Sequence, residues 1–404
     1  MNTAFVVDGL RTPIGSFGGS LASVRPDDMA ALVIQRLLER HRSLDPARID
    51  DVILGCANQA GEDNRNVARM ALLLAGLPVE VPGITVNRLC ASGMSAIGYA
   101  AAQVRAGEGQ LFVAGGVESM TRAPYVLSKG SAPWARDAKL YDTSIGWRFV
   151  NQCMEELYRT DSMGQTAENV ASLHAGSRED QDAFAVLSQQ KAAIARESGR
   201  LSREITPVTV PGATKGSTVD FAQDEFPRPG TSTEILARLR PAFRTDGGGS
   251  VTAGNSSGIN DGACAVLVAS DEAVQVHALP VLARIVASVA VGVEPRLMGM
   301  GPVPATRRVL ELAGLRLDQV DVIEINEAFA SQSLACLREL GIADDDPRVN
   351  RNGGAIALGH PLGMSGARLV LSAARELAVA GGRYALCTMC VGVGQGTAMV
   401  LERA

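Results

Sequence analysis

The stretch Cys90-Ala-Ser-Gly-Met-Ser95 decides the fold, because part of it returns late in the chain. Gly93-Met94-Ser95 recurs as Gly363-Met364-Ser365, an offset of 270 residues (363 − 93). Asp51-Val52-Ile53 recurs as Asp321-Val322-Ile323 at the same offset. One such match is within reach of chance in a chain rich in Gly, Ala and Val. Two matches at one offset predict an internal duplication.

The segments around these repeats alternate between short apolar runs and helical patterns. We expect strands at residues 4–8, 51–55 and 110–115 with helices at 29–40 and 93–106, then strands at 320–325 and 384–389 with a helix at 366–380. Such alternation indicates βαβ units and a largely parallel sheet. The sequence therefore predicts an α/β chain of two related halves. The offset of 270 carries Cys90 onto His360, so each half presents one polar residue at an equivalent turn before a helix.

A stretch of different composition separates the halves. Residues 121–258 hold all four lysines and both tryptophans of the chain, and a capping pattern at Ser177 predicts a helix over 177–198. Too many apolar and aromatic residues lie here for a solvated linker. We therefore expect three units: an N-terminal half (1–120, completed by about 259–280), an inserted loop domain (121–258) and a C-terminal half (281–404).

Composition excludes several classes of protein. The net charge is −5 (38 − 43), which argues against a nucleic-acid partner, since phosphate contacts need clustered cations. The lack of an apolar run of 18 residues and of a leader pattern predicts neither a membrane span nor secretion, and hence a cytoplasmic protein. Seven scattered cysteines indicate reduced thiols.

Four segments combine reactive side chains with the ends of predicted strands, and all but the second contain glycine: residues 86–94, 326–330, 353–366 and 387–396. In open α/β sheets, ligands bind at that edge. Cys90 precedes a helix, whose dipole is expected to lower the pKa of the thiol and favour a nucleophile. His360 lies in a turn between Gly359 and Pro361 and would take the proton from Cys90, then hydrogen-bond a thioester oxygen.

Cys390 is followed by Gly392, Gly394 and Gly396, whose backbone N–H groups can point at an oxyanion. A second thiol without a disulfide context suggests a proton carrier. The alternative is a redox or metal pair with Cys387; without a second pair or a nearby His, we expect no metal site. Asn326 could orient a water molecule, and Glu327 could brace the turn.

These four segments resemble those of the thiolase family, and the likeness runs from Arg11 to Glu402. The resemblance implies two duplicated βαβαβαββ halves packed in layers, with the loop domain binding coenzyme A. It makes Cys90 the acylated nucleophile, His360 its base and Cys390 the general acid/base. Asn326 would hold the water of one oxyanion hole, while the N–H groups of Cys90 and Gly392 would form the other. It further implies ping-pong chemistry on acyl-CoA substrates without a prosthetic group, in a homodimer or homotetramer.

The resemblance also marks positions that contact coenzyme A. They lie in and around the loop domain and comprise Met163, Arg228, Leu239, Phe243, Ala253, Ser257, Met298, Ala328 and Phe329. Arg228 is the expected partner of a nucleotide phosphate. Two positions depart from the pattern, with Ser162 where many members have His and Ile235 where some have Ser.

Within the family, residues 56–66, 89–93, 142–148 and 387–395 are most similar to 3-oxoadipyl-CoA thiolases of aromatic-compound breakdown. This implies cleavage of 3-oxoadipyl-CoA by CoA to succinyl-CoA and acetyl-CoA. Three alternatives stay open: an acetyl-CoA acetyltransferase acting on acetoacetyl-CoA, a ketosynthase, and a lipid binder with the same fold. A ketosynthase would place a second His at Asn326 or Cys390. A lipid binder would have lost Cys90 or His360.

A distal carboxylate needs a cationic partner when it is buried. Arg148, in the aromatic-flanked turn 145–149, is the candidate, since its planar fork can bind a carboxylate with two hydrogen bonds. The alternative is a surface or interface arginine stacked on Trp147.

Overall fold

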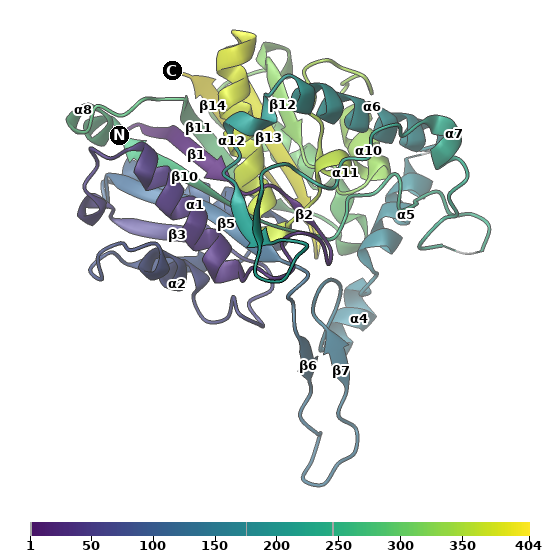
Figure 1. Cartoon of the computed structure of the whole chain (residues 1–404). Helices are drawn as coiled ribbons and strands as arrows, with labels where there is room; N and C mark the ends of the chain where they lie inside the picture. Colours follow the sequence, from purple (N-terminus) through teal and green to yellow (C-terminus); the bar gives the residue numbers. More distant parts are fainter. Residues whose placement is uncertain (1, 175, 245) are drawn as a thin grey trace.

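A mixed β-sheet of ten strands runs through the molecule, and both halves of the chain contribute to it (Figure 1). The computed structural model describes residues 2–174, 176–244 and 246–404. From one edge, the strands of the first half are β4 (Gly83–Val86), β3 (Asp51–Gly55), β5 (Leu111–Ser119), β10 (Asn260–Ser270) and β1 (Ala4–Arg11), with β2 (Gly15–Ser16) beside β10. The second half continues with β11 (Ala283–Gly292), β14 (Gln395–Arg403), β13 (Tyr384–Val391) and β12 (Val322–Ile325). The halves join where β1 pairs antiparallel with β11. The expectation of a largely parallel sheet is wrong, because only β3–β4, β3–β5 and β12–β13 are parallel and the strands between them pair antiparallel.

The two halves repeat one topology, as the sequence repeat predicts. In the first half β3 is parallel to β4 and β5, whereas in the second β12 is parallel to β13 and bridges Val349 where a counterpart of β4 would lie. The helices correspond in order: α1 (Pro26–Arg40) to α9 (Pro302–Ala313), α2 (Val67–Leu74) to α10 (Ala330–Glu339), and α3 (Ser92–Ala106) to α12 (Leu362–Ala380). The predicted duplication is therefore present in the fold.

Helices and strands lie in layers around two buried helices. In β5, Leu111 and Val113 pack with α1 and α2, while Phe112 and Ala114 pack with α3 and α12. This split follows from the alternation of side chains across a strand. The helices α9 and α10 cover the other side of the second half. The helices α3 and α12 thus form a middle layer that both halves share.

Glycines allow the first turns of α3 and α12 to touch through their backbones. A Cβ on Gly93 would lie 2.5 Å from the carbonyl oxygen of Gly363, and one on Gly363 would lie 2.5 Å from that of Val117. Real Cβ atoms do not approach backbone so closely, so both positions require glycine. The turns that carry Cys90 and His360 are consequently held against each other.

Residues 121–258 form a separate layer of helices and hairpins. They contain α4 (Gln152–Tyr158), α5 (Met163–Leu173), α6 (Arg178–Glu197), α7 (Thr233–Leu236) and the strand pairs β6–β7 (Tyr125–Leu127, Leu140–Asp142) and β8–β9 (Val208–Pro211, Thr218–Phe221). The β6–β7 hairpin extends away from the rest of the molecule (Figure 1). The Ser177 side chain accepts the Asp180 N–H at 3.0 Å, which confirms the predicted cap. Two short helices, α8 (Asp271–Val276) and α11 (Ala355–Leu358), complete the fold. In the described ranges, every helix is too short or too polar to span a bilayer.

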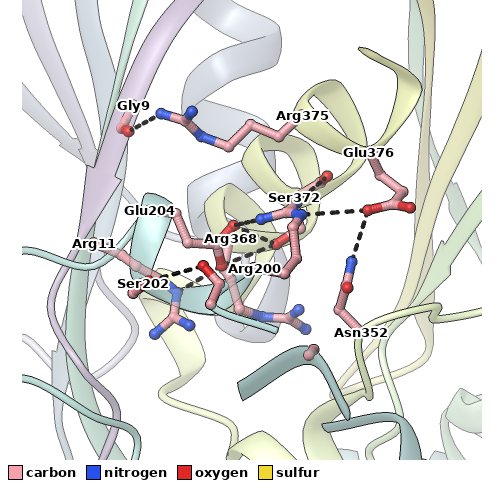
Figure 2. Close-up of polar contacts among 12 residues, drawn as sticks. Gly9, Arg11, Arg200, Ser202, Glu204, Asn352, Arg368, Ser372, Arg375 and Glu376 are labelled. Carbon is pink, nitrogen blue, oxygen red and sulfur yellow. Dashed lines mark hydrogen bonds and ion pairs between the residues drawn. The ribbon is translucent and has the colours of Figure 1, made fainter. Parts of the chain in front are cut away.

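A buried ion cluster ties the inserted segment to the core (Figure 2). Arg11, at the end of β1, pairs with Glu204 at 2.9 Å and with Asp224 at 2.7 Å. Arg200 pairs with the other oxygen of Glu204 at 3.1 Å and with Glu376 of α12 at 3.3 Å. Burial by itself would raise the pKa of Glu204, but the charges of Arg11 and Arg200 outweigh it and lower the pKa to about 2. Glu204 therefore stabilises the fold as a carboxylate.

Glu204→Gln is expected to destabilise the protein by about 3–5 kcal/mol at neutral pH, because it leaves two buried guanidinium groups short of a partner. A folded-state pKa below the unfolded one gives a contribution that is complete above the unfolded value and is lost as the pH falls towards about 2. The difference in free energy of unfolding between wild type and variant, measured with urea, should therefore decrease between about pH 5 and pH 3. Glu197→Gln, an exposed change on α6, is the control. A gap independent of pH would contradict this role.

Candidate active site

Cys90 lies in a locked turn between a strand and a helix. The strand β4 ends at Val86, and a 3-10 turn (Leu89–Ala91) precedes α3, so Cys90 does not end the strand itself. Leu89 has a φ of 45°, an unusual conformation for a residue with a side chain. Its N–H donates to Asn87 Oδ1 at 2.8 Å, and its carbonyl accepts the Ser92 hydroxyl at 2.6 Å. The main chain therefore fixes the direction of the thiol.

Cys90 lines a cavity of about 300 Å³, and its environment favours the protonated thiol. Burial raises its pKa to about 11, and the charge of Glu118 adds to the rise. The backbone N–H groups of Gly392 and of Cys90 itself act in the opposite direction. The expectation of a lowered pKa is wrong, because loss of hydration outweighs the donors at the start of the helix. A nucleophilic role for Cys90 at neutral pH would therefore require a base.

His360 has the protonation state that a base requires. Its Nδ1 lies 2.7 Å from Ser365 Oγ, whose hydroxyl donates to the Pro361 carbonyl at 2.8 Å. With that hydroxyl proton in use, Nδ1 must be the donor, which assigns Nε2 as the unprotonated nitrogen. Burial, followed by the charge of Arg368, lowers the pKa of His360 to about 3. The ring is therefore neutral, with Nε2 able to accept a proton.

The structure brings the turns of Cys90 and His360 together. They precede α3 and α12, whose first turns meet at Gly93 and Gly363. The helix α12 also packs against the 3-10 turn of Cys90, and Leu362 lines the same cavity as Cys90. The duplicated positions in the sequence are thus neighbours in space.

Asn326 and Cys390 complete the site from the second half. The Asn326 amide nitrogen lies 3.3 Å from His360 Nε2. Asn326 is fully buried, yet its Oδ1 has no hydrogen-bond partner among the described residues. Burial, followed by the charge of Cys90, raises the pKa of Cys390 well above its usual range. The strand β13 packs against the turn that carries Cys90, and Met163 both lines the Cys90 cavity and packs with Cys390, so the two thiols belong to one region.

Cys387 does not share this site with Cys390. The two lie three residues apart on β13, so their side chains point to opposite faces of the strand. Cys387 packs in the middle layer and donates to the Leu369 carbonyl at 3.5 Å, while Cys390 packs with Met163 and Met298. This geometry opposes the redox and metal interpretations of the pair.

Most positions expected to contact coenzyme A gather around Cys390. Met163, Met298, Ala328 and Phe329 form one apolar cluster with it. The Phe243 ring meets the Phe329 ring edge-on at 6.2 Å, and the Ser257 N–H donates to the Ala328 carbonyl at 3.0 Å.

Three further positions lie towards the surface. Ala253 is exposed. Leu239 packs close to Gly254, the residue that follows Ala253. Arg228 is exposed, with its guanidinium 5.4 Å from the centre of the Phe226 ring. Its described contacts link it to neither Cys90 nor Cys390.

Glu118, which was not identified from the sequence, lines the same cavity as Cys90. Its oxygens accept the N–H groups of Ala57 at 2.9 Å, Asn58 at 3.0 Å and Gly363 at 2.8 Å. Burial raises its pKa to about 7. Glu118 is the only charged residue in β5, a buried strand that is mostly apolar and glycine-rich. A charge in such a strand was the one sequence signal for its role.

Glu118, Cys56 and Asp63 also bring their ligand atoms within 4.8 Å of one another in the described chain. The Glu118 oxygens already accept backbone N–H groups, however, and the Cys56 thiol lies 3.4 Å from Asp63 Oδ2. The cluster is therefore satisfied by hydrogen bonds without a cation.

Comparison with known families fits this arrangement. The family described as "Thiolase, N-terminal domain" matches residues 4–272, and "Thiolase, C-terminal domain" matches residues 279–403. The chain belongs to the thiolase family. It is thus an acyltransferase, and the expected enzyme class is confirmed.

Relatives of this thiolase cover its full length. It is 60% identical over 403 residues, all of both chains, to the Escherichia coli (strain K12) protein named 3-oxoadipyl-CoA/3-oxo-5,6-dehydrosuberyl-CoA thiolase. It is 48% identical, over the whole of both chains, to the Pseudomonas aeruginosa protein named acetyl-CoA acetyltransferase. The crystal structure of the Bacillus anthracis acetyl-CoA acetyltransferase superimposes with a TM-score of 0.92 and 39% identity, covering 100% of this chain and 99% of that one. The expected thiolase fold is confirmed.

We predict that acetyl-CoA acetylates this thiolase at Cys90. Incubation followed by peptide mass spectrometry should find one added acetyl group on the peptide that holds Cys90. Cys90→Ala should lose the label and keep the fold, because a small side chain replaces a small one. Label on Cys390 or Cys387 in the wild type would refute the assignment.

Proposed function

We propose that this thiolase cleaves 3-oxoadipyl-CoA with CoA, giving succinyl-CoA and acetyl-CoA. The observation that carries the proposal is 60% identity, over the full length of both chains, to a relative named for 3-oxoadipyl-CoA. Identity to the relative named acetyl-CoA acetyltransferase is lower, at 48%. Cleavage is the easier direction for the family, which favours a catabolic role.

In the first half-reaction Cys90 attacks the C3 ketone of the substrate. His360 Nε2 takes the thiol proton as the S–C bond forms, since a thiol of raised pKa and a neutral imidazole stand ready for that transfer. The N–H groups of Cys90 and Gly392, which already point at the sulfur, stabilise the oxyanion. The C2–C3 bond then breaks and leaves succinyl on Cys90.

The departing fragment is the enolate of acetyl-CoA. Cys390 protonates its carbon, while His360 and a water molecule on Asn326 stabilise its oxygen. The buried Asn326 Oδ1, which has no partner in the described part of the chain, supports that role, because a buried amide oxygen needs a hydrogen-bond donor. In the second half-reaction the Cys390 thiolate takes the proton of CoA, and the CoA sulfur collects the succinyl group from Cys90.

The inserted segment 121–258, between the halves 1–120 (with 259–280) and 281–404, acts in this proposal as the coenzyme A domain. Phe243, Met163 and Met298 supply apolar surface near Cys390 for the pantetheine arm. Arg228 is exposed and so is accessible to a nucleotide phosphate.

The assembly is a homodimer or homotetramer in this proposal, and the protein works in the cytoplasm. The projecting β6–β7 hairpin supports assembly, because Tyr125, Leu127 and Leu140 are each 65–69% exposed there. Molar mass in solution tests this point. All seven cysteines are free thiols, as is usual in the cytoplasm.

Cys390→Ser is expected to slow carbon–carbon bond cleavage by roughly 10²–10⁴-fold, because a hydroxyl is a far weaker acid than a thiol. Transfer of an acyl group between Cys90 and CoA should suffer much less. Thiolysis rates and acyl exchange with labelled CoA separate the two steps. Equal losses in both would show that Cys390 is structural.

The substrate assignment is tested by steady-state thiolysis of 3-oxoadipyl-CoA and acetoacetyl-CoA. We expect kcat/KM to favour 3-oxoadipyl-CoA by about tenfold or more, since a site built to pair a polar group discriminates against substrates that lack it. A preference for acetoacetyl-CoA would replace the proposal with the acetyl-CoA acetyltransferase alternative.

A further inference from the structure

The cavity that Cys90 lines has one cationic side chain among its described lining residues. That residue is Arg148, and it comes from a run of six consecutive lining positions, residues 143–148. The wall is otherwise apolar or neutral, apart from Glu118. Arg148 thus borders the space that an acyl group on Cys90 would enter, and its guanidinium contacts Asn58, another lining residue.

Arg148 is anchored without being neutralised. Its Nη2 donates to the Asn58 carbonyl at 3.1 Å, and the Asn58 side chain in turn donates to the Thr143 carbonyl at 2.8 Å. No carboxylate among the described residues lies within 4.0 Å of the guanidinium. Glu118, which shares the cavity, directs its oxygens to the backbone N–H groups of Ala57, Asn58 and Gly363. The remaining N–H groups of Arg148 are therefore available to a ligand.

We propose that Arg148 binds the distal carboxylate of the acyl group and so determines the substrate specificity of this thiolase. This rests on the proposed function and deepens it. In a succinyl group on Cys90, four covalent bonds separate the sulfur from the carboxylate carbon. That is a reach of roughly 5 Å, given C–C bonds of about 1.5 Å. The carboxylate stays inside the cavity that Cys90 and Arg148 both line.

The energetics favour a dicarboxylic acyl chain over a neutral one. A carboxylate loses hydration when it enters a cavity walled by Leu89, Trp147 and Leu362, and a guanidinium fork restores that loss with two charged hydrogen bonds. A chain that ends in a methyl group gives Arg148 no such partner. The side chain therefore selects between substrates of equal length by their terminal group.

The decisive pair of substrates is 3-oxoadipyl-CoA and 3-oxohexanoyl-CoA, which have the same chain length and reacting atoms but end in carboxylate and methyl. Arg148→Gln should lower kcat/KM for 3-oxoadipyl-CoA by roughly thirty- to a thousand-fold, the usual loss for truncating one partner of a buried charge pair. It should leave 3-oxohexanoyl-CoA within about threefold, the spread of a surface change. Arg148→Lys should recover part of the loss. Arg42→Gln, an exposed arginine in the turn after α1, is the matched control and should change neither rate.

Acylation measured directly gives a second readout. Succinyl-CoA and butyryl-CoA should both acylate Cys90 of the wild type, and intact mass follows each reaction. Arg148→Gln should slow succinylation alone.

The possible failures can be told apart. If the wild type cleaves acetoacetyl-CoA but not 3-oxoadipyl-CoA, the proposed function fails. If the wild type cleaves 3-oxoadipyl-CoA, two results overturn the inference alone: an equal loss on both six-carbon substrates, which means that Arg148 supports the fold or coenzyme A, or no loss on either.

Discussion

The contact between the first turns of α3 and α12 is the constraint on which the rest of the structure depends. Gly93 and Gly363 meet without side chains, and they do so in the one layer that both halves share. A Cβ on Gly93 would meet the Gly363 carbonyl oxygen and push the two helices apart, while one on Gly363 would meet the Val117 carbonyl oxygen and push α12 away from the sheet. The same contact explains how one duplicated turn could acquire a sulfur in one copy and an imidazole in the other and still form a single site.

That close contact also sets the electrostatics of the site. Packing around the two turns reduces their hydration, which raises the pKa of the Cys90 thiol and lowers the pKa of His360. In the proposed mechanism the reaction therefore begins from an uncharged pair, in which charge develops only as the thiol attacks. Backbone N–H groups from both halves lie beside the sulfur, close to where the oxyanion of an attacked carbonyl would form. Burial would make an isolated thiol unreactive. In the proposed mechanism Cys90 reacts because His360 accepts its proton and the N–H groups of Cys90 and Gly392 stabilise the oxyanion.

Much of the fold was predictable from the sequence, because the signals were local or repeated. The offset of 270 residues predicted the duplication, and Ser177 predicted the start of α6. The pKa of Cys90 was predicted in the wrong direction, since position before a helix is visible in a sequence and depth of burial is not. Glu118 and Ser365 were missed for a related reason. Glu118 acts through backbone N–H groups that are distant in the chain. Ser365 acts because its hydroxyl proton is already donated to the Pro361 carbonyl. No spacing rule predicts either arrangement.

Asn58 shows how the reacting atoms and the distal end of the cavity are mechanically linked. Its N–H is held by Glu118, which also holds the N–H of Gly363 at the start of α12. Its side chain holds Thr143, and its carbonyl holds Arg148. One buried carboxylate therefore positions the turn after His360 and, through a single residue, the wall that carries Arg148. Glu118 lies on β5 and Gly363 on α12, so their hydrogen bond fixes the start of α12 relative to the wall that carries Arg148. The packed core therefore sets the distance between the turn after His360 and Arg148. A site that selects acyl groups by length needs this rigidity.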